Sequence, residues 1–315
     1  MKDIYSNINS FNKKILKKTV KYLNQGNIAG LPTETVYGLG GNAYSKRAIT
    51  KIYKLKKRPK KNPLIIHYYS IKDAEKDVIF NKHFLKLYKQ FCPGPLTFIL
   101  KKKRNSKIVS QALSDLDTVA IRFPKNKIIK TILKYLNFPL AMPSANLSSK
   151  LSPVCAEDVC EEFKNNLKII INGGKSKIGI ESTVIDLIEK PRILRPGIIS
   201  QSDIQKFLRL NIQKKKIKVI SPGMLKKHYS PGIPVIIGKM AKKEENAYIG
   251  FGRNFRDSNN CYNLSKKADL KEAASNLYKI MRKIKKKGYK KIYVGKIPNK
   301  GPGIAINDRL KRASK

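Results

Sequence analysis

Apolar residues recur three and four positions apart at several places along the chain, and this spacing predicts amphipathic helices. The first predicted helix begins near Phe11 and ends at Gly26, where glycine is a stop signal, and the second follows Ser45. Further helical patterns cover residues 71–80, 84–90, 128–136 and 270–284. The lysines of the first helix fall on its polar face, so we expect them in solvent while the apolar face packs on a sheet.

Short apolar runs between these helices predict β-strands. They lie at residues 28–31, 64–69, 96–100, 119–123, 140–142, 168–171, 183–187, 235–237, 248–251 and 291–294. Strands and helices interleave irregularly, which favours mixed strand direction over a uniformly parallel sheet. The pattern therefore predicts an α/β fold with an open, mixed, twisted sheet flanked by helices.

Both kinds of pattern fade between residues 210 and 234, where two Ser-Pro-Gly steps begin at Ser221 and Ser230. Because a length of 315 residues favours two domains, we interpret this stretch as an interdomain linker. The predicted organisation is a first α/β domain at residues 1–209, a linker at 210–234 and a small Rossmann-like α/β domain at 235–315.

The formal net charge of +47 at pH 7 creates a field that attracts nucleotides, pyrophosphate or RNA. Lysine is spread over nearly the whole chain, so no disordered nucleic-acid-binding tail is indicated. The four cysteines form no C-x-x-C pair and only three histidines accompany them, which argues against a structural zinc site. With no signal-peptide pattern and no apolar run approaching about 18 residues, we expect a soluble, reduced, cytoplasmic protein without a membrane span.

A glycine-rich loop follows the first predicted strand, within residues 31–41. We expect a strand-to-helix loop in which hydroxyls such as Thr35 lie beside glycines that let a ligand approach the backbone. An ordinary capped turn is the alternative. Gly38, Gly40 and Ala43 fit the loose dinucleotide pattern G-x-G-x-x-A, but the acidic residue required about 20 positions later is missing, which argues against a nicotinamide or flavin site.

A basic turn lies one predicted helix later. Lys56 and Arg58 precede its prolines, and Asn62 and His67 follow on the way into a strand. Fixed positive charge beside hydrogen-bonding groups suits capture of phosphate or carboxylate, with Arg58 as a bidentate fork and Lys56 as a point charge. In so lysine-rich a chain, solvated lysines and a core histidine are the alternative interpretation.

Arginines and hydroxyls also occur at the ends of other predicted strands. They are Thr35, Arg122, Ser144, Ser152, Ser182 and Arg195. If the sheet brings these strand ends together, one edge gathers cations and hydroxyls with hardly a carboxylate. The segment ending at Ser176 is not a P-loop, since Ile169 replaces its first glycine. Such a site would bind anions and catalyse by positioning and charge neutralisation.

Seven motifs occur in order along the first two thirds of the chain. They are Pro32-Thr-Glu-Thr-Val-Tyr-Gly-Leu39, Lys56-x-Arg-Pro59 with Asn62-Pro-Leu64 and His67, Pro93-Gly-Pro-Leu-Thr97, Ala120-Ile-Arg122, Pro143-Ser-Ala-Asn146, Gly179-Ile-Glu-Ser-Thr183 and Leu194-Arg-Pro-Gly197. Three more follow: Ser221-Pro-Gly-Met224, His228-Tyr-Ser-Pro231 and Gly301-x-Gly-x-Ala-Ile-Asn-Asp-Arg-Leu310. Together they resemble the threonylcarbamoyl-AMP synthase family (YrdC-type proteins), in its long, two-domain branch. Lys57 and Ser149 stand where that family commonly has glycine, and Val154 replaces a common threonine.

The resemblance implies a YrdC-like fold and an L-threonylcarbamoyladenylate synthase. Such a nucleotidyltransferase condenses L-threonine, bicarbonate and ATP to threonylcarbamoyl-AMP and pyrophosphate, for threonylcarbamoyladenosine modification of tRNA beside the anticodon. It implies Mg²⁺ that arrives with ATP and is not permanently bound. It also implies a downstream tRNA threonylcarbamoyl transferase as partner, with a weak contact to tRNA.

The same resemblance implies the site residues. Catalytic roles fall to Lys56 and Arg58. Threonine contacts are implied at Thr35, His67, Arg122, Met142 and Ser182. ATP contacts are implied at Arg58, Asn62, Thr118, Ser144, Ser152, Arg195 and Tyr229. Because Tyr229 lies in the predicted linker, we expect the linker to act as a lid that excludes water from the product's mixed anhydride. A linker merely docked on the first domain is the alternative.

Two other functions stay open on the sequence alone. A double-stranded RNA-binding module would bind RNA with steep salt dependence and would not turn over ATP. A carbamoyl-transfer domain like that of hydrogenase-maturation proteins would normally bring an acylphosphatase-like segment and paired C-x-x-C motifs, which this chain lacks.

Overall fold

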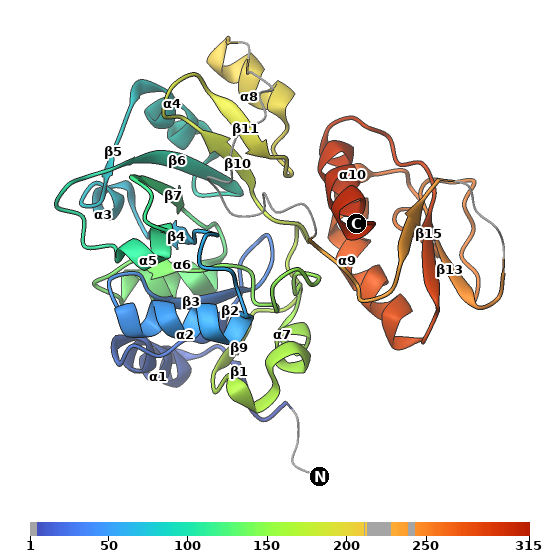
Figure 1. Cartoon of the computed structure of the whole chain (residues 1–315), viewed down its shortest axis with the longest axis horizontal. Coiled ribbons are helices and arrows are strands. Elements are labelled where there is room, and N and C mark those ends of the chain that lie inside the picture. The colour runs from blue at the N-terminus through green and yellow to red at the C-terminus, as the bar shows by residue number, and fades with distance from the viewer. Residues whose placement is uncertain (1–4, 211, 213–227, 239–242) are drawn as a thin grey trace.

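A computed structural model describes residues 5–210, 212, 228–238 and 243–315. Figure 1 shows a large N-terminal domain beside a smaller C-terminal one, with α9 and α10 of the small domain on the side that faces the large domain. Of the predicted linker, residues 210, 212 and 228–234 are described. The first Ser-Pro-Gly step and Met224 lie outside the described residues.

Eleven strands of the described chain form one sheet in the large domain. They are β1 (Ile8–Ser10), β2 (Ala29–Leu31), β3 (Gly38–Asn42), β4 (Ile65–His67), β5 (Val78–Ile79), β6 (Leu96–Lys102), β7 (Thr118–Arg122), β8 (Leu140–Ala141), β9 (Ile170–Asn172), β10 (Thr183–Asp186) and β11 (Arg192–Arg195). The order is β1-β9-β2-β3-β8-β4-β7-β6-β10-β11, with β5 beside β6. Parallel pairs such as β4/β7 and β6/β10 alternate with antiparallel pairs such as β6/β7 and β10/β11, which confirms the predicted mixed sheet.

The helices of the large domain pack on this sheet (Figure 1). They are α1 (Lys13–Asn24), α2 (Lys46–Lys56), α3 (Ile71–Ala74), α4 (Lys82–Phe91), α5 (Ser110–Leu113), α6 (Lys127–Lys134), α7 (Ala156–Phe163) and α8 (Gln201–Leu208), with a 3₁₀ turn at Lys164–Asn166. Side chains cap several N-termini: Asn12 accepts from the Ile15 amide and Ser45 from the Ala48 amide. The apolar faces then enter the core, as Ile49 and Ile52 of α2 do.

Two local predictions were wrong. The helix expected at residues 71–80 ends at Ala74, and Val78 and Ile79 pair with β6 instead, so tertiary pairing overrides the helical pattern. The glycine-rich stretch is not loop throughout, because Gly38–Asn42 forms β3 antiparallel to β2. A Cβ on Gly38 would lie 2.3 Å from the Met142 Cγ, so glycine there lets the strand approach its neighbour.

Sequence reasoning also overlooked several elements. These are β1, α5, α7, α8, β14 and α10, most of which are short or carry weak periodicity. The predicted helices at 84–90, 128–136 and 270–284 are confirmed as α4, α6 and α9.

The small domain contains a four-stranded sheet of order β12-β15-β13-β14. Its strands are β12 (Val235–Ile237), β13 (Asn246–Gly250), β14 (Cys261–Asn263) and β15 (Lys291–Val294), and all three neighbouring pairs are parallel. Helices α9 (Leu270–Lys286) and α10 (Pro302–Ala313) cover it. Apolar residues of both helices share a core with Val235 and Ile292 of the sheet. This arrangement confirms the small parallel α/β domain.

Lys57 and Ser149 adopt left-handed backbone conformations, with φ of 49° and 70°. These are the two positions where the resembling family commonly has glycine, the residue that tolerates this region without steric cost. The chain therefore keeps the turn geometry of both loops with a lysine and a serine.

Candidate active site

A polar cavity lies where the ends of several strands of the large sheet meet the linker. Nine of the predicted site residues line it: Thr35, Arg58, His67, Arg122, Met142, Ser144, Ser182, Arg195 and Tyr229. The sheet gathers them because β4, β7, β8 and β11 end there, and the loops after β2 and before β10 close over those ends. The strand ends that carry these residues therefore meet at one cavity.

Arg122 ends β7 and is 4% exposed. Its Nη1 donates to the Thr35 Oγ1 at 2.8 Å, and its Nη2 donates to the Glu34 Oε1 at 2.6 Å. The other Glu34 oxygen accepts from the backbone amides of Lys125 and Asn126. Glu34 therefore fixes the guanidinium, which still has N–H groups for a bound anion.

Arg58 is held by the turn that follows it. Its Nη2 donates to the Asn62 Oδ1 at 2.7 Å and to the Pro63 carbonyl oxygen at 2.8 Å, and its Nε donates to the Asn62 carbonyl oxygen. Burial lowers the pKa of Arg58 to about 10, so the guanidinium stays charged at neutral pH. Asn62 is buried behind Arg58 and positions it.

Lys56 is 1% exposed at the end of α2. Its ammonium donates to the backbone carbonyl oxygens of Ser144 and Asn146. Lys56 therefore holds the loop that follows β8 and carries Ser144, here called the serine loop. Burial, and then the charge of Arg58, hold the pKa of Lys56 well below its usual range. Lys56 acts on the cavity through Ser144, which lines it.

Arg195 leaves β11 and turns back toward the start of β10. Its Nε donates to the Ser182 carbonyl oxygen and its Nη2 to the Ser182 Oγ, both at 3.1 Å. Thr97 shares a hydrogen bond of 2.8 Å with the same serine hydroxyl. Two sequence motifs far apart in the chain therefore anchor one guanidinium.

His67 lies at the end of β4 and is 2% exposed. Burial, reinforced by the charge of Arg122, lowers the pKa of His67 to about 3. The imidazole is therefore neutral at physiological pH and can exchange hydrogen bonds without adding charge to the cavity.

Besides Asn62, which lies behind Arg58, two predicted ATP contacts do not line the cavity. Thr118 begins β7 and pairs with Lys101, at the opposite end of the strand from Arg122. Ser152 is fully buried, and its hydroxyl donates to the Glu181 carboxylate. The resemblance carried both positions over by sequence alone, and the strand direction separates Thr118 from the rest.

The described end of the linker forms one wall of the cavity. His228 and Tyr229 are 7% and 1% exposed, and their ring centroids are 4.1 Å apart. Among the described residues, neither the His228 Nδ1 nor the Tyr229 hydroxyl has a hydrogen-bond partner. Burial lowers the pKa of His228 to about 3, so its ring is neutral. Two buried polar atoms without partners at a cavity wall are typical of a ligand-binding surface.

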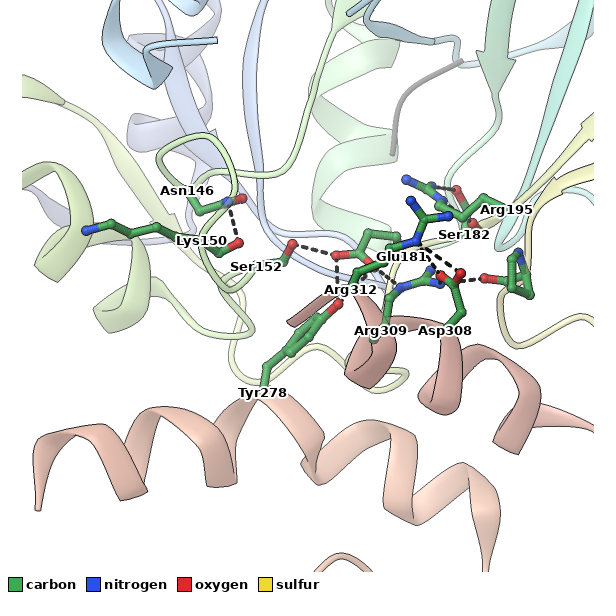
Figure 2. A network of polar contacts seen from close by, with 11 residues as sticks. Asn146, Lys150, Ser152, Glu181, Ser182, Arg195, Tyr278, Asp308, Arg309 and Arg312 are labelled. Atoms are coloured by element: carbon green, nitrogen blue, oxygen red, sulfur yellow. Dashed lines mark hydrogen bonds and ion pairs between the residues drawn. The ribbon is translucent and has the colours of Figure 1, made fainter. Parts of the chain in front are cut away.

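A polar network joins the two domains behind this wall (Figure 2). The Glu181 carboxylate, at the cavity, accepts from the Arg309 Nε at 2.9 Å and from the Tyr278 hydroxyl at 3.1 Å. Arg309 belongs to α10 and Tyr278 to α9. Sequence analysis quoted the motif that contains Arg309 but gave it no role, since a pattern does not reveal which domain a side chain faces.

The described residues contain no group of three or more His, Cys, Asp and Glu side chains that could hold a metal ion. No helix within them is long and apolar enough to cross a membrane.

Comparison with known proteins identifies the family. A family model described as "Telomere recombination" matches residues 21–197, and a model described as "Threonylcarbamoyl-AMP synthase, C-terminal domain" matches residues 199–315. The threonylcarbamoyl-AMP synthase of Pyrococcus abyssi is 36% identical over 93% of this chain and 92% of its own length. The chain belongs to the threonylcarbamoyl-AMP synthase family. This synthase is an enzyme, a nucleotidyltransferase that makes threonylcarbamoyl-AMP for the threonylcarbamoyladenosine modification of tRNA.

Further relatives agree with this assignment. The threonylcarbamoyl-AMP synthase of Bacillus subtilis is 33% identical and covers 97% of this chain and 94% of its own. A crystal structure of P. abyssi Sua5 complexed with L-threonine superimposes on this synthase with a TM-score of 0.89, covering 98% of this chain and 97% of that one at 33% identity. Both domains of this synthase therefore have the architecture of its relatives.

Proposed function

We propose that the cavity binds L-threonine at its Arg122 end and ATP at its Arg58 and Arg195 end. One observation carries this assignment: three buried arginines line one small cavity, and the described residues of its lining include a single carboxylate, which is already paired. Guanidinium groups bind carboxylates and phosphates by charge-assisted hydrogen bonds. The complex of P. abyssi Sua5 with L-threonine supports a threonine site in this fold.

The threonine subsite consists of Arg122, Thr35, His67, Met142 and Ser182. Arg122 binds the carboxylate of the amino acid with its remaining N–H groups. The neutral His67 leaves the threonine amine without a competing cation, and Met142 offers an apolar contact to the threonine methyl group. All five residues line the same cavity, which supports the grouping.

The nucleotide subsite consists of Arg58, Ser144, Arg195 and Tyr229. Three further residues support this subsite without lining the cavity. Asn62 holds Arg58, Lys56 holds the serine loop, and Ser152 donates a hydrogen bond to Glu181. Thr118 is left out of the nucleotide contacts, because it lies at the start of β7, the end of the strand opposite Arg122.

The chemistry proceeds in two steps. The threonine amine attacks carbon dioxide or bicarbonate, and the resulting carbamate, after loss of water where bicarbonate is used, carries the carboxylate that attacks the α-phosphorus of ATP. The bond to pyrophosphate breaks and pyrophosphate leaves. Arg58 and Arg195, with Lys56 nearby, offset the charge that builds between the α- and β-phosphates. No covalent enzyme intermediate is needed.

Magnesium enters as a complex with ATP. The carboxylate of the cavity lining, Glu181, is committed to Arg309 and Tyr278, so the protein supplies no free acidic ligand at the described wall. A cation held by phosphates and water fits this donor set, since Mg²⁺ keeps several waters and binds substrate phosphates. When bound, it neutralises the phosphates.

The domain boundaries of 1–209, 210–234 and 235–315 remain part of the proposal. Helix α8 packs against α4, which supports an N-terminal domain that extends to about residue 209. The linker role rests on His228 and Tyr229, which line the cavity and whose His228 Nδ1 and Tyr229 hydroxyl have no hydrogen-bond partner among the described residues. A bound nucleotide would give those atoms partners, as expected for a lid.

Replacing Tyr229 with phenylalanine tests the lid. A buried hydroxyl without a partner contributes little to the free protein, so Tyr229→Phe should leave the melting temperature unchanged or slightly higher. The KM for ATP should rise about three- to tenfold, from the loss of one hydrogen bond of about 0.5 to 1.5 kcal/mol. Steady-state kinetics and thermal melts measure both. An unchanged KM for ATP would show that the hydroxyl does not reach the nucleotide.

The product must pass to a tRNA threonylcarbamoyl transferase, because a mixed anhydride hydrolyses readily in water. The high positive charge supports a weak contact with tRNA during this transfer. We place the reaction in the cytoplasm, where tRNA is modified.

Pyrophosphate release tests the function as a whole. Release from ATP should require both L-threonine and bicarbonate, and the AMP-linked product together with the AMP from its hydrolysis should equal the pyrophosphate released. Omission of either substrate should reduce release to the background of an enzyme-free control. ADP and phosphate as main products would contradict the proposal.

A further inference from the structure

A carboxylate lies in the wall of a cavity proposed to bind ATP. Glu181 is 6% exposed, and it is the only acidic side chain among the described residues that line this cavity. A buried carboxylate repels phosphates unless a cation neutralises it, because charges interact strongly where water is excluded. The nucleotide site therefore depends on whatever pairs with Glu181.

The small domain provides this pairing. Arg309 is 1% exposed on α10, and its Nε donates to Glu181 at 2.9 Å. The Tyr278 hydroxyl of α9 lies within 3.2 Å of both oxygens of the same carboxylate. Within the described part of the large domain, the Ser152 hydroxyl is the one direct donor to this carboxylate (Figure 2). The charge of the cavity wall is thus balanced across the domain interface.

The same arginine also reaches the backbone next to Arg195. Its Nη1 donates to the Pro196 carbonyl oxygen at 2.9 Å, one residue after Arg195. On the other side, Glu181 directly precedes Ser182, which accepts both hydrogen bonds of the Arg195 guanidinium. The Arg309 guanidinium carbon also lies 5.1 Å from the centre of the Tyr229 ring. Arg309 therefore contacts the segments on both sides of the Arg195 guanidinium.

We infer that Arg309 is a positioning residue through which the small domain completes the nucleotide site: it neutralises Glu181 and fixes Arg195 and Tyr229. The inference rests on the proposed ATP subsite. It gives the small domain a part in the reaction, because the large domain alone would present an unpaired carboxylate to ATP. Removing one partner of a buried ion pair leaves the other charge uncompensated.

A pH profile separates this role from simple domain packing. The charged and titratable groups around Glu181 are Arg309 from α10, Tyr278 from α9, Arg195 after β11, and His228 and Tyr229 from the linker. Burial alone would raise the pKa of Glu181, but Arg309 and Arg195 outweigh burial and lower it to about 2. Without Arg309, that pKa rises. The carboxyl is then neutral at low pH and ionised at high pH.

The test uses the full chain with Arg309→Met, Arg309→Lys and the double variant Glu181→Gln/Arg309→Met. Arg309→Met should raise the KM for ATP about tenfold at pH 8, with a much smaller change in the KM for threonine. The KM for ATP of Arg309→Met, divided by that of the enzyme without substitutions, should fall toward pH 6, as Glu181 becomes protonated. The double variant should recover most of the lost affinity and show no such pH dependence. Arg309→Lys keeps the positive charge. Its KM for ATP should lie between those of Arg309→Met and the double variant.

Arg282→Met is the matched control. Arg282 also crosses the interface, where its Nη2 donates to the Leu151 carbonyl oxygen at 2.6 Å, but it does not contact Glu181 or line the cavity. Its loss should leave the KM for ATP within about twofold if general loosening of the interface is unimportant.

Three outcomes overturn the inference: equal effects of Arg309→Met on both substrates, a pH-independent defect, or no recovery in the double variant. If Arg309→Met does not fold, the comparison of Arg309→Lys with the double variant decides in the same way. Arg195→Ala, measured alongside, distinguishes a wrong ATP subsite from a wrong role for Arg309. If it leaves the KM for ATP unchanged, the proposed ATP subsite is wrong. If it raises that KM while Arg309→Met does not, only the role of Arg309 fails.

Discussion

Replacing Arg122 with alanine is expected to raise the KM for threonine about ten- to a hundredfold and to change the KM for ATP far less. The guanidinium is held by Thr35, Glu34 and the Gly94 carbonyl oxygen, and it lines the cavity with N–H groups still available. Loss of a charge-assisted contact to a carboxylate costs about 1.5 to 3 kcal/mol, which corresponds to this range. Steady-state kinetics with each substrate varied in turn measures both constants.

A second variant separates binding from stability. Arg122→Ala leaves the Glu34 carboxylate buried without its cation, so the free energy of unfolding should also fall. Glu34→Gln/Arg122→Ala removes both charges and should regain much of that stability without regaining affinity for threonine. If the double variant binds threonine normally, Arg122 acts only as the partner of Glu34. Equal increases in both KM values would likewise contradict the threonine assignment.

Periodicity predicted most of the long elements because their burial is regular. Helices α2, α4, α6 and α9 each bury a stripe of apolar residues against a sheet, and that stripe is visible in the sequence. Strand β3 was overlooked because glycine has no side chain with which to show a pattern. Its glycines are required by contact: a Cβ on Gly40 would lie 2.7 Å from the Leu31 Cδ1. Close backbone approach leaves no periodic signal in a sequence.

The sequence predicted which side chains share one cavity better than it predicted the local structure. Motif by motif, the resemblance brought together Arg122 of β7, Arg195 of β11 and polar residues of the neighbouring loops, and the sheet gathers nearly all of them at one cavity. Sequence reasoning could not separate the residues that line the cavity from those that support them. Asn62 and Lys56 point their polar atoms at Arg58 and at the serine loop, a distinction that depends on side-chain direction.

The contacts between the two domains could not be predicted from the sequence, for a different reason. Glu181 and Arg309 are 128 residues apart, and no local spacing relates them. The carboxylate of Glu181, which lies between the apolar Ile180 and the hydroxyl residue Ser182, was the available signal, since a buried charge requires a partner. That partner could have come from any element of either domain, so the pairing needed the fold.

Arg58→Ala and Arg195→Ala are each expected to raise the KM for ATP about ten- to a hundredfold, with the KM for threonine changing much less. Both side chains are buried and line the cavity. Arg58 is anchored by acceptors from its own loop, and Arg195 is anchored by Ser182, directly before β10. Each stays cationic at neutral pH and can therefore form charge-assisted bonds to phosphate of about 1.5 to 3 kcal/mol. Steady-state kinetics, with pyrophosphate release as the readout, measures the effect.

Arg192→Ala is the control for loss of any arginine from β11. Arg192 is on the same strand as Arg195, but it pairs with Asp186 and does not line the cavity. Its replacement should lower stability, because Asp186 is left buried without its cation, and it should leave the KM for ATP nearly unchanged. If Arg192→Ala raises the KM for ATP as much as Arg195→Ala does, the effect comes from a change in β11 as a whole. Arg195 would then have no shown contact with the phosphates, and Arg58 alone would carry the nucleotide assignment.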